Sequence, residues 1–251
     1  MTQQTVATKY AQETNGATLR FEHGPFLINP SLPLPKRFVL TKTHCTGYCT
    51  FCSQSGSLVS PSKFAERCHP GSKLPTASRR EPVHRAIHLI RDPFDNLVAR
   101  MHLATKTGRV ESLDHTREGL LTWSSQLQEK WGTTRKAALE ADVFELMEQV
   151  PCGSDWFRYV QWHNNALEMI ESQGLETLVL YYEDYTEHFN ATVDSILSFL
   201  EQRTENPPIE FIPGKRYRGL FTKDEIQSAR RLVHRLASPS LWQLLRHYFD
   251  E

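Results

Sequence analysis

The chain has 251 residues, 39% of them hydrophobic, with 29 basic and 29 acidic side chains. A chain of this length and apolar content can bury a sizeable core, so the composition excludes intrinsic disorder and fits one α/β or barrel domain. The balanced charge gives no general electrostatic attraction to nucleic acid or to a membrane surface. No run approaches the roughly 18 apolar residues of a membrane helix, and residues 1–15 lack the apolar centre of a signal peptide, so no membrane segment is predicted in this chain.

The first predicted element is a short buried strand that ends in a loop. Residues 1–36 are polar and then rich in proline, which predicts an irregular arm, and residues 37–251 are predicted to form one domain. An apolar run at residues 38–40 predicts the strand. The loop after it, residues 42–47, contains a lysine, two threonines and a glycine that allows close approach of the backbone. These features predict an anion-binding loop.

The segment from residue 53 to residue 85 is locally basic. Ser60-Pro61 predicts the start of a helix that runs through Cys68. Six basic residues stand against Glu66 and Glu81, which is typical either of a solvated loop or of a basic rim for an anionic substrate. The six are Lys63, Arg67, Lys73, Arg79, Arg80 and Arg85.

A second strand, residues 83–90, is predicted to end at an arginine. Arg91-Asp92-Pro93 marks this end, because Asp is a good N-cap and Pro is favoured at the first helical position. The helix that follows is predicted to end at Gly108. The guanidinium of Arg91 is therefore expected at the carboxyl edge of a sheet, where open α/β folds bind ligands.

The rest of the chain is predicted to be mostly helical, with one further strand at residues 177–182 that runs into Glu183-Asp184. A capping box from Thr222 to Glu225 and the Ser238-Pro239 pair each predict a helix start. This alternation of few strands with many helices predicts a parallel sheet covered on both faces. The other predicted helices cover residues 118–131, 134–150, 154–172 and 187–202.

Three segments, in this order, resemble the sulfotransferases that use 3′-phosphoadenosine-5′-phosphosulfate (PAPS). They are the loop at residues 42–47, the run Ile-Arg-Asp-Pro-Phe-Asp-Asn-Leu-Val at 90–98, and the run Leu-Tyr-Tyr-Glu-Asp-Tyr at 180–185. The resemblance spans roughly residues 37–250 and is nearest to the carbohydrate-type and algal branches. It implies a three-layer α/β fold like that of P-loop NTPases, with a mostly parallel central sheet and helices on both faces.

The resemblance also implies a cofactor site built from three parts of the chain. Lys42 and the loop amides would hold the 5′-phosphosulfate, because a fixed cation and converging N–H groups stabilise charge on the leaving group. Arg91 would bind the 3′-phosphate through two charge-assisted hydrogen bonds. A basic, glycine-containing run at residues 215–219 would close the site. The remaining implied cofactor residues are Thr43, Cys45, Thr46, Gly47, Lys215 and Arg216.

The catalytic base is left open. Sulfuryl transfer needs positioning and charge stabilisation, so the resemblance implies no metal, but an acceptor hydroxyl needs a base. Glu66 lies about two dozen residues beyond Lys42, similar to the catalytic glutamate of glycan and tyrosine sulfotransferases. His44 and His69 are the other candidates, because histidine side chains titrate nearer neutrality.

One position departs from the family pattern. Sulfotransferases usually have a serine eight residues after the arginine, bound to the same 3′-phosphate, and here that position is Ala99. The loss of one hydrogen bond to a charged group costs on the order of 1.5–3 kcal/mol unless another group compensates. Arg100 and the 215–219 run are the candidates to compensate. Glu183 and Asp184 are expected to organise the sheet edge and the next helix.

The cysteines offer a rival interpretation. Cys45, Cys49 and Cys52 have the spacing Cys-x3-Cys-x2-Cys, with which radical S-adenosylmethionine enzymes hold a [4Fe–4S] cluster. Against this, no Gly-Gly-Glu segment follows, and the Arg91 motif would stay unexplained. Structural disulfides among these residues and Cys68 would instead place the protein in an oxidising compartment, and the Golgi or secretory lumen is favoured over the cytoplasm.

Two further features bear on this compartment. The chain has five cysteines, Cys152 being the last, so at least one thiol is left unpaired within a monomer. The Asn190-Ala191-Thr192 sequon is compatible with secretion.

The sequence therefore predicts a sulfotransferase that moves the sulfuryl group of PAPS to a hydroxyl or amine. The basic segment favours an anionic acceptor such as a glycan, with a small hydroxylated molecule as the other class. A non-catalytic, sulfotransferase-like nucleotide-binding module is the main alternative, because Ala99 is the kind of loss such a module would show. A nucleotide kinase is disfavoured, since the loop lacks a Gly-Lys-Ser/Thr ending.

Overall fold

The structure is a computed structural model of the whole chain. It describes the backbone at residues 9–10 and 20–21, Cys45, and residues 58–68, 84–106, 108, 113–132, 139–203 and 211–250. In the first of these parts, β1 (Lys9–Tyr10) and β2 (Arg20–Phe21) form a short antiparallel pair within the predicted arm.

The centre of the described fold is a pair of parallel strands. β3 (Arg85–Ile90) and β4 (Glu176–Tyr181) are in register from their first to their last residues. Parallel neighbours need a long crossover. Helices provide it here: α3 (Pro93–Lys106), α4 (Arg117–Gly132), α5 (Ala141–Glu148) and α6 (Gly153–Ser172).

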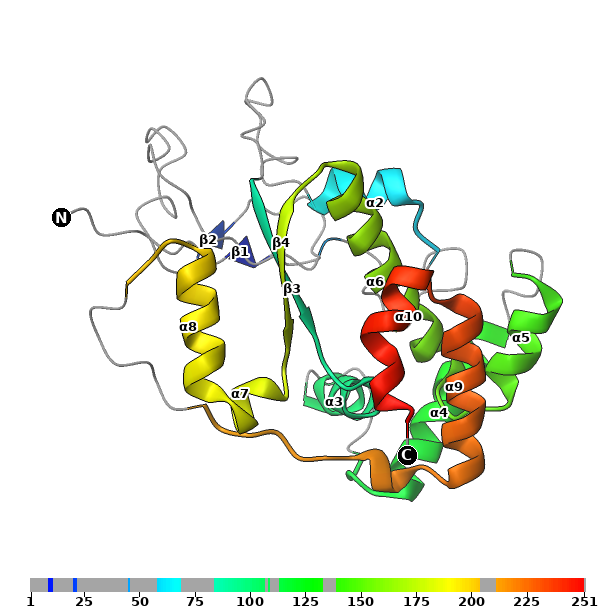
Figure 1. Cartoon of the computed structure of the whole chain (residues 1–251). Helices are drawn as coiled ribbons and strands as arrows, with labels where there is room; N and C mark the ends of the chain where they lie inside the picture. Colours follow the sequence, from blue (N-terminus) through cyan, green and yellow to red (C-terminus); the bar gives the residue numbers. More distant parts are fainter. Residues whose placement is uncertain are drawn as a thin grey trace.

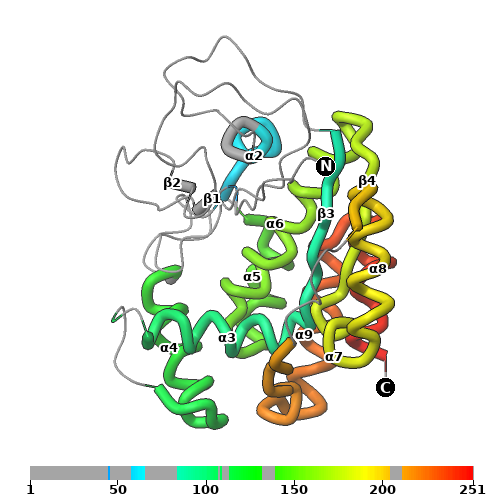
Figure 2. The backbone as a smooth tube through the Cα atoms, turned by 90° about the vertical axis from the view of Figure 1, so that its left-hand side faces the viewer, coloured from blue at the N-terminus to red at the C-terminus, as the bar shows by residue number. Residues whose placement is uncertain are grey.

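Helices lie on both sides of this strand pair. Figures 1 and 2 show α6 on one side and α8 (Phe189–Phe199) on the other, with the short α7 (Asp184–Glu187) leading from β4 into α8. The predicted α/β class is thus confirmed, while within the described ranges the parallel sheet has two strands and a larger central sheet is not shown. The carboxyl-terminal elements are η1 (Arg218–Leu220), α9 (Lys223–Leu236), α10 (Pro239–Leu245) and η2 (Arg246–Tyr248).

Local capping sets the helix starts where the sequence predicts them. The Asp92 carboxylate accepts a hydrogen bond from the Phe94 N–H at 2.8 Å, directly before α3. Thr222 and Glu225 form the reciprocal capping box of α9. The Ser238 hydroxyl accepts the Leu241 N–H ahead of α10, and α2 (Pro61–Cys68) also begins at its predicted proline.

The main core ties the end of β3 to the carboxyl-terminal helices. The Phe94 ring lies 4.9 Å from the ring of Trp156, 5.0 Å from Phe221 and 5.6 Å from Phe249, measured between centroids. Trp123 and Trp156 are fully buried in this core. These contacts fix the backbone from which Arg91 projects.

A second, smaller cluster joins α2 to α6. Phe64 and Ala166 are buried there, with Cys45 and Trp162 packed against them. Beside this cluster, His88 of β3 and His163 of α6 face each other with Nε2 and Nδ1 2.9 Å apart. Figure 1 shows α2 near the amino-terminal end of β3, away from α3.

Two predicted boundaries differ from the structure. The helix predicted for residues 187–202 is α8, which begins only at Phe189 because the backbone of His188 lies outside the helical region at φ −136°, and the short α7 before it is not predicted. The helix predicted for residues 134–150 is described as α5 at Ala141–Glu148, and residues 133–138 lie outside the described part. Within the described ranges, no helix combines the length and apolar character needed to span a membrane.

Candidate functional site

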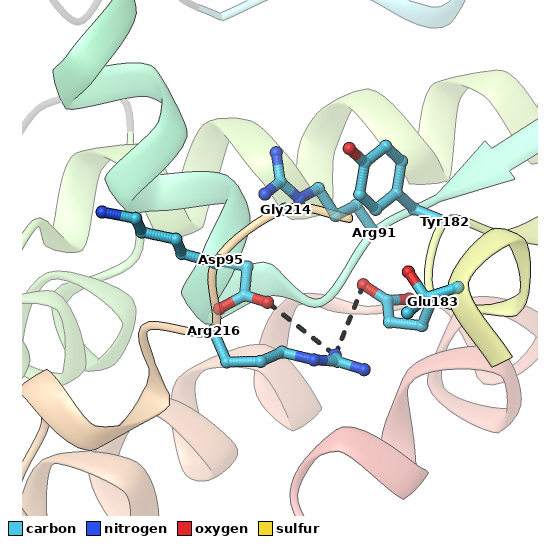
Figure 3. Close-up of a pocket in the computed structure, with 8 residues that line it drawn as sticks. Arg91, Asp95, Tyr182, Glu183, Gly214 and Arg216 are labelled. Carbon is cyan, nitrogen blue, oxygen red and sulfur yellow. Dashed lines mark ion pairs between the residues drawn. The ribbon is translucent and has the colours of Figure 1, made fainter. Parts of the chain in front are cut away.

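The parallel strands end side by side, and the residues that follow them form a small pocket. Ile90 pairs with Tyr181, and the Tyr182 N–H continues the ladder by donating to the Ile90 carbonyl at 2.7 Å. A third segment, residues 211–218, crosses this edge and is called the strap below. The pocket encloses about 210 Å³, its open mouth included (Figure 3). It is lined by Arg91, Asp95, Tyr182, Glu183, Thr186, Gly214, Lys215 and Arg216.

Arg91 is positioned by its backbone and by an aromatic ring. Its carbonyl accepts a hydrogen bond from the Tyr159 hydroxyl at 2.8 Å, and its guanidinium carbon lies 4.6 Å from the centroid of the Tyr182 ring. Gly214 approaches closely, since a Cβ there would stand 3.2 Å from Arg91 Nη2. Within the described residues Arg91 has no ion pair, and its buried Nε has no hydrogen-bond partner. The guanidinium is therefore available to an anion.

Arg216 of the strap lies among carboxylates. Its guanidinium is 3.3 Å from Glu187, 3.8 Å from Asp95 and 3.9 Å from Glu183, and the last two contacts are the dashed lines of Figure 3. The side chain is 53% exposed. Contacts this long at an exposed site are weak and are screened by salt. The exposed guanidinium of Arg216 can therefore be reached by an incoming anion.

Asp95 is the buried acid of the pocket. It lies in the first turn of α3 and is 3% exposed. One carboxylate oxygen accepts the Tyr217 N–H at 2.6 Å. Burial raises the pKa of Asp95, while the Tyr217 hydrogen bond and the positive charges of Arg91 and Arg216 act in the opposite direction.

Glu183 holds the edge of the site together, as predicted. One of its oxygens accepts the Asp92 N–H at 2.9 Å and the other accepts the Tyr248 hydroxyl at 2.7 Å. The neighbouring Asp92 carboxyl is buried, and burial together with the negative charge of Asp95 raises its pKa to about 6. Glu183 thus joins the end of β4 to the start of α3 and to the carboxyl terminus.

The structure brings together only part of the predicted cofactor set. Arg91, Lys215 and Arg216 all line the pocket, although Arg91 is more than 120 residues from the other two in sequence. The loop residues Lys42, Thr43, His44, Thr46 and Gly47, and also His69, lie outside the described residues. Glu66 is on α2, and α2 lies beside the amino-terminal half of β3 (Figure 1). The structure does not describe the Glu66 side chain.

The cysteines fall into two groups. Cys45 is half-buried and packs against the small cluster around Phe64. Cys152 is a buried free thiol, and burial raises its pKa well above the usual value. Among the described residues, no three His, Cys, Asp or Glu side chains are grouped closely enough to hold a metal ion.

The suggestion that Arg100 compensates for Ala99 is wrong. Arg100 Nη2 lies 3.2 Å from the fully buried Asp155 carboxylate, and its side chain is 10% exposed. Arg100 therefore points into the protein interior. The strap cations Lys215 and Arg216 are the remaining candidates to compensate for Ala99.

Arg85 is also excluded from a basic rim around this pocket. Its guanidinium donates to Glu176 at 2.7 Å, to Glu201 at 2.5 Å and to the Phe199 carbonyl at 2.8 Å. These partners hold it at the start of β3, at the opposite end of the strand from the pocket.

Sequence reasoning missed the remaining pocket residues. Asp95 and Tyr182 stand within the motifs that carry the resemblance, so a signal for them existed, but no local pattern gives them a role. Gly214 and Thr186 have no sequence signal, because only the folded strap and α7 place them at the strand ends.

Comparison with known families agrees with this geometry. A family model for the sulfotransferase domain matches residues 60–213, more than half of the chain. The match contains the ends of β3 and β4 with Arg91, Tyr182 and Glu183, starts after the 42–47 loop and ends two residues before Lys215. No curated protein and no solved structure matches the chain. Since the match covers more than half of the chain, the chain belongs to the sulfotransferase-domain family.

Proposed function

We propose that this protein is a PAPS-dependent sulfotransferase that transfers a sulfuryl group to a hydroxyl or amine of an acceptor. The observation that carries the proposal is the state of Arg91, whose guanidinium lies in an open pocket at the strand ends without a carboxylate partner among the described residues. A guanidinium that is held in place but forms no ion pair within the described part of the chain suits a phosphate group.

The charge of the pocket supports a phosphate ligand. Three cations, Arg91, Lys215 and Arg216, line it against two carboxylates, Asp95 and Glu183. The cations come from two distant parts of the chain, so folding creates the positive site. Arg91 would bind the 3′-phosphate of PAPS, and Lys215 and Arg216 would add charge where the usual serine is replaced by Ala99.

Lys42 and the amides of residues 43–47 would hold the phosphosulfate. In the transfer, an acceptor oxygen or nitrogen forms a bond to sulfur while the bond from sulfur to the bridging phosphate oxygen breaks. Adenosine 3′,5′-bisphosphate leaves with the negative charge of that oxygen, which Lys42 would stabilise. A base, for which Glu66, His44 and His69 are the candidates, would take the acceptor proton.

We infer the cellular compartment from Cys45 and the acceptor class from the basic residues of the segment after the loop. A disulfide at Cys45 would fit an oxidising lumen such as the Golgi, and it would disfavour a [4Fe–4S] site because a disulfide sulfur is not a thiolate ligand. The basic residues between Lys63 and Arg80 favour an anionic acceptor such as a glycan over a neutral small molecule.

The proposal is tested by transfer of labelled sulfate. The full chain is incubated with PAPS labelled on sulfur and with a panel of sulfated glycans, neutral glycans and small phenols. Label is expected to move to a glycan, and the Lys42→Ala variant is expected to lose most of this turnover while still binding adenosine 3′,5′-bisphosphate through Arg91. Unchanged turnover in Lys42→Ala contradicts the role of the loop. Nucleotide binding without turnover on any acceptor supports the non-catalytic module that Ala99 suggests.

A further inference from the structure

Asp95 is a buried carboxylate in a pocket that is proposed to bind an anion. Asp95 lines the same pocket as Arg91 and Lys215, and its side chain is almost fully buried. A negative charge at this place opposes the binding of a phosphate, and burying it is unfavourable. The position of Asp95 therefore implies a contribution that outweighs both effects.

The Asp95 carboxylate forms a hydrogen bond and an ion pair with residues of the strap. One oxygen accepts the Tyr217 N–H at 2.6 Å, and the other lies 3.8 Å from the Arg216 guanidinium. The hydrogen bond joins residues that are 122 positions apart in sequence. It fixes the strap backbone one residue beyond Arg216 and two residues beyond Lys215.

Other contacts hold the two ends of the strap. At its start, the Phe211 ring packs on Tyr182 with centroids 5.2 Å apart. At its end, Arg218 donates to the Tyr248 carbonyl and lies over the Phe94 ring. The Tyr217 hydroxyl is 2.9 Å from His115 Nδ1, but this contact restrains a side chain and leaves the backbone free to shift. Among the described contacts, the bond to Asp95 is the backbone hydrogen bond nearest to the two strap cations.

We propose that Asp95 is a positioning residue, whose carboxylate holds the strap backbone at Tyr217 so that Lys215 and Arg216 line the same pocket as Arg91. That Asp95 holds the strap is inferred from the contacts of the strap alone. That this affects nucleotide affinity rests on the proposed function. The bond requires an acceptor oxygen at position 95, whereas the negative charge itself works against an anionic ligand.

This distinction predicts opposite results for two substitutions. Asp95→Asn keeps an oxygen that can accept the Tyr217 N–H and removes the charge. Asp95→Ala removes both. We expect the strap to stay in place in Asp95→Asn and to move in Asp95→Ala. A residue that merely stabilised the fold would give two variants that differ only in overall stability.

The test combines amide hydrogen exchange at Tyr217 with calorimetric titration of adenosine 3′,5′-bisphosphate, both on the full chain. In Asp95→Ala, exchange at the Tyr217 amide should speed up roughly tenfold or more, and nucleotide affinity should fall about tenfold, since a hydrogen bond to a charged group is lost. In Asp95→Asn, the amide should stay protected, and affinity should be retained or rise up to about threefold because a like charge is removed. The control His115→Phe, which removes only the side-chain contact of Tyr217, should leave amide exchange unchanged.

Unchanged exchange at Tyr217 in Asp95→Ala would overturn the inference, and so would equally fast exchange in Asp95→Asn. If Asp95→Ala does not fold, Asp95→Asn still decides, because protection and affinity must both survive in it. If the unsubstituted protein binds no nucleotide, the proposed function fails, while the exchange data still show whether Asp95 holds the strap.

Discussion

Two arginines border the same strand, and they differ in their partners. Arg85 begins β3 and is saturated by Glu176, Glu201 and the Phe199 carbonyl. Arg91 directly follows β3 and has only the Tyr182 ring and its own backbone contacts among the described residues. The first has counter-ions within hydrogen-bond distance and serves the fold; the second lacks them and lies in a pocket. Having no ion pair among the described residues therefore distinguishes Arg91 as the candidate binding residue, which the residue type alone does not do.

The largest effect should come from removing each arginine in turn. Arg91→Ala should reduce the affinity for adenosine 3′,5′-bisphosphate by roughly 100-fold, because two charge-assisted hydrogen bonds to the 3′-phosphate are lost. Arg85→Ala should leave that affinity unchanged and lower the free energy of unfolding only slightly, since its two carboxylate partners are exposed. Calorimetric titration and urea denaturation measure the two quantities. A similar loss of affinity in both variants would contradict the assignment of Arg91 to ligand binding and of Arg85 to the fold.

The free energy of unfolding should depend on pH through two buried histidines, His88 in the middle of β3 and His163 of α6. Burial lowers the pKa of His88 to about 4, and burial and His88 lower the pKa of His163 well below its usual value. Both side chains are thus neutral in the folded protein, whereas in the unfolded chain they take up protons near pH 6.5. The free energy of unfolding should therefore fall as pH drops from about 6.5 toward 4, by on the order of 2 kcal/mol at pH 5 for His88 alone.

The matched control is the double variant His88→Gln/His163→Asn, whose amides can keep the hydrogen bond without titrating. Between pH 7 and pH 5 the original protein should lose stability relative to this variant, measured by urea denaturation. The comparison also cancels Asp92, whose raised pKa acts with the opposite sign, since a buried carboxyl favours the folded state as pH falls. Parallel pH profiles for the two proteins would contradict the assignment of neutral histidines.

The smallest effect should come from restoring the serine that the family usually has. Ala99→Ser should raise the affinity for adenosine 3′,5′-bisphosphate by roughly three- to tenfold, because one hydroxyl can donate to the 3′-phosphate. Ala99 is half-buried on α3, one turn beyond Asp95, so a hydroxyl adds little volume there. The gain should vanish in the Arg91→Ala background. A gain of equal size in that background would mean that the introduced hydroxyl lies away from the phosphate.

The parts of the fold that the sequence predicts correctly are those set by local features, such as helix caps and short apolar runs. The caps at Asp92, Thr222 and Ser238 act within four residues, so the starts of α3, α9 and α10 can be read directly. The start of α8 after His188 has no cap signal, and the sequence places the start of this helix two residues too early, at Glu187. The strand pair is predictable because its apolar runs are short and bounded by turn-forming residues.

The site is predicted less completely, because most of its contacts are tertiary. Arg91 can be found from its place after a strand, yet the bond from Tyr217 to Asp95 depends on how the strap crosses α3. The same holds for Arg100, whose pairing with Asp155 requires α3 and α6 to pack together. The 42–47 loop remains a prediction, since apart from Cys45 it lies outside the described residues.

The most direct test of Arg91 as a phosphate-binding residue compares two nucleotides on two proteins. The full chain and Arg91→Ala are each titrated calorimetrically with adenosine 3′,5′-bisphosphate and with adenosine 5′-phosphate, which lacks the 3′-phosphate. We predict that the unsubstituted protein prefers the bisphosphate by about 30-fold or more, and that this preference disappears in Arg91→Ala. Equal affinity of the unsubstituted protein for both nucleotides, or a preference that persists without Arg91, would contradict the assignment.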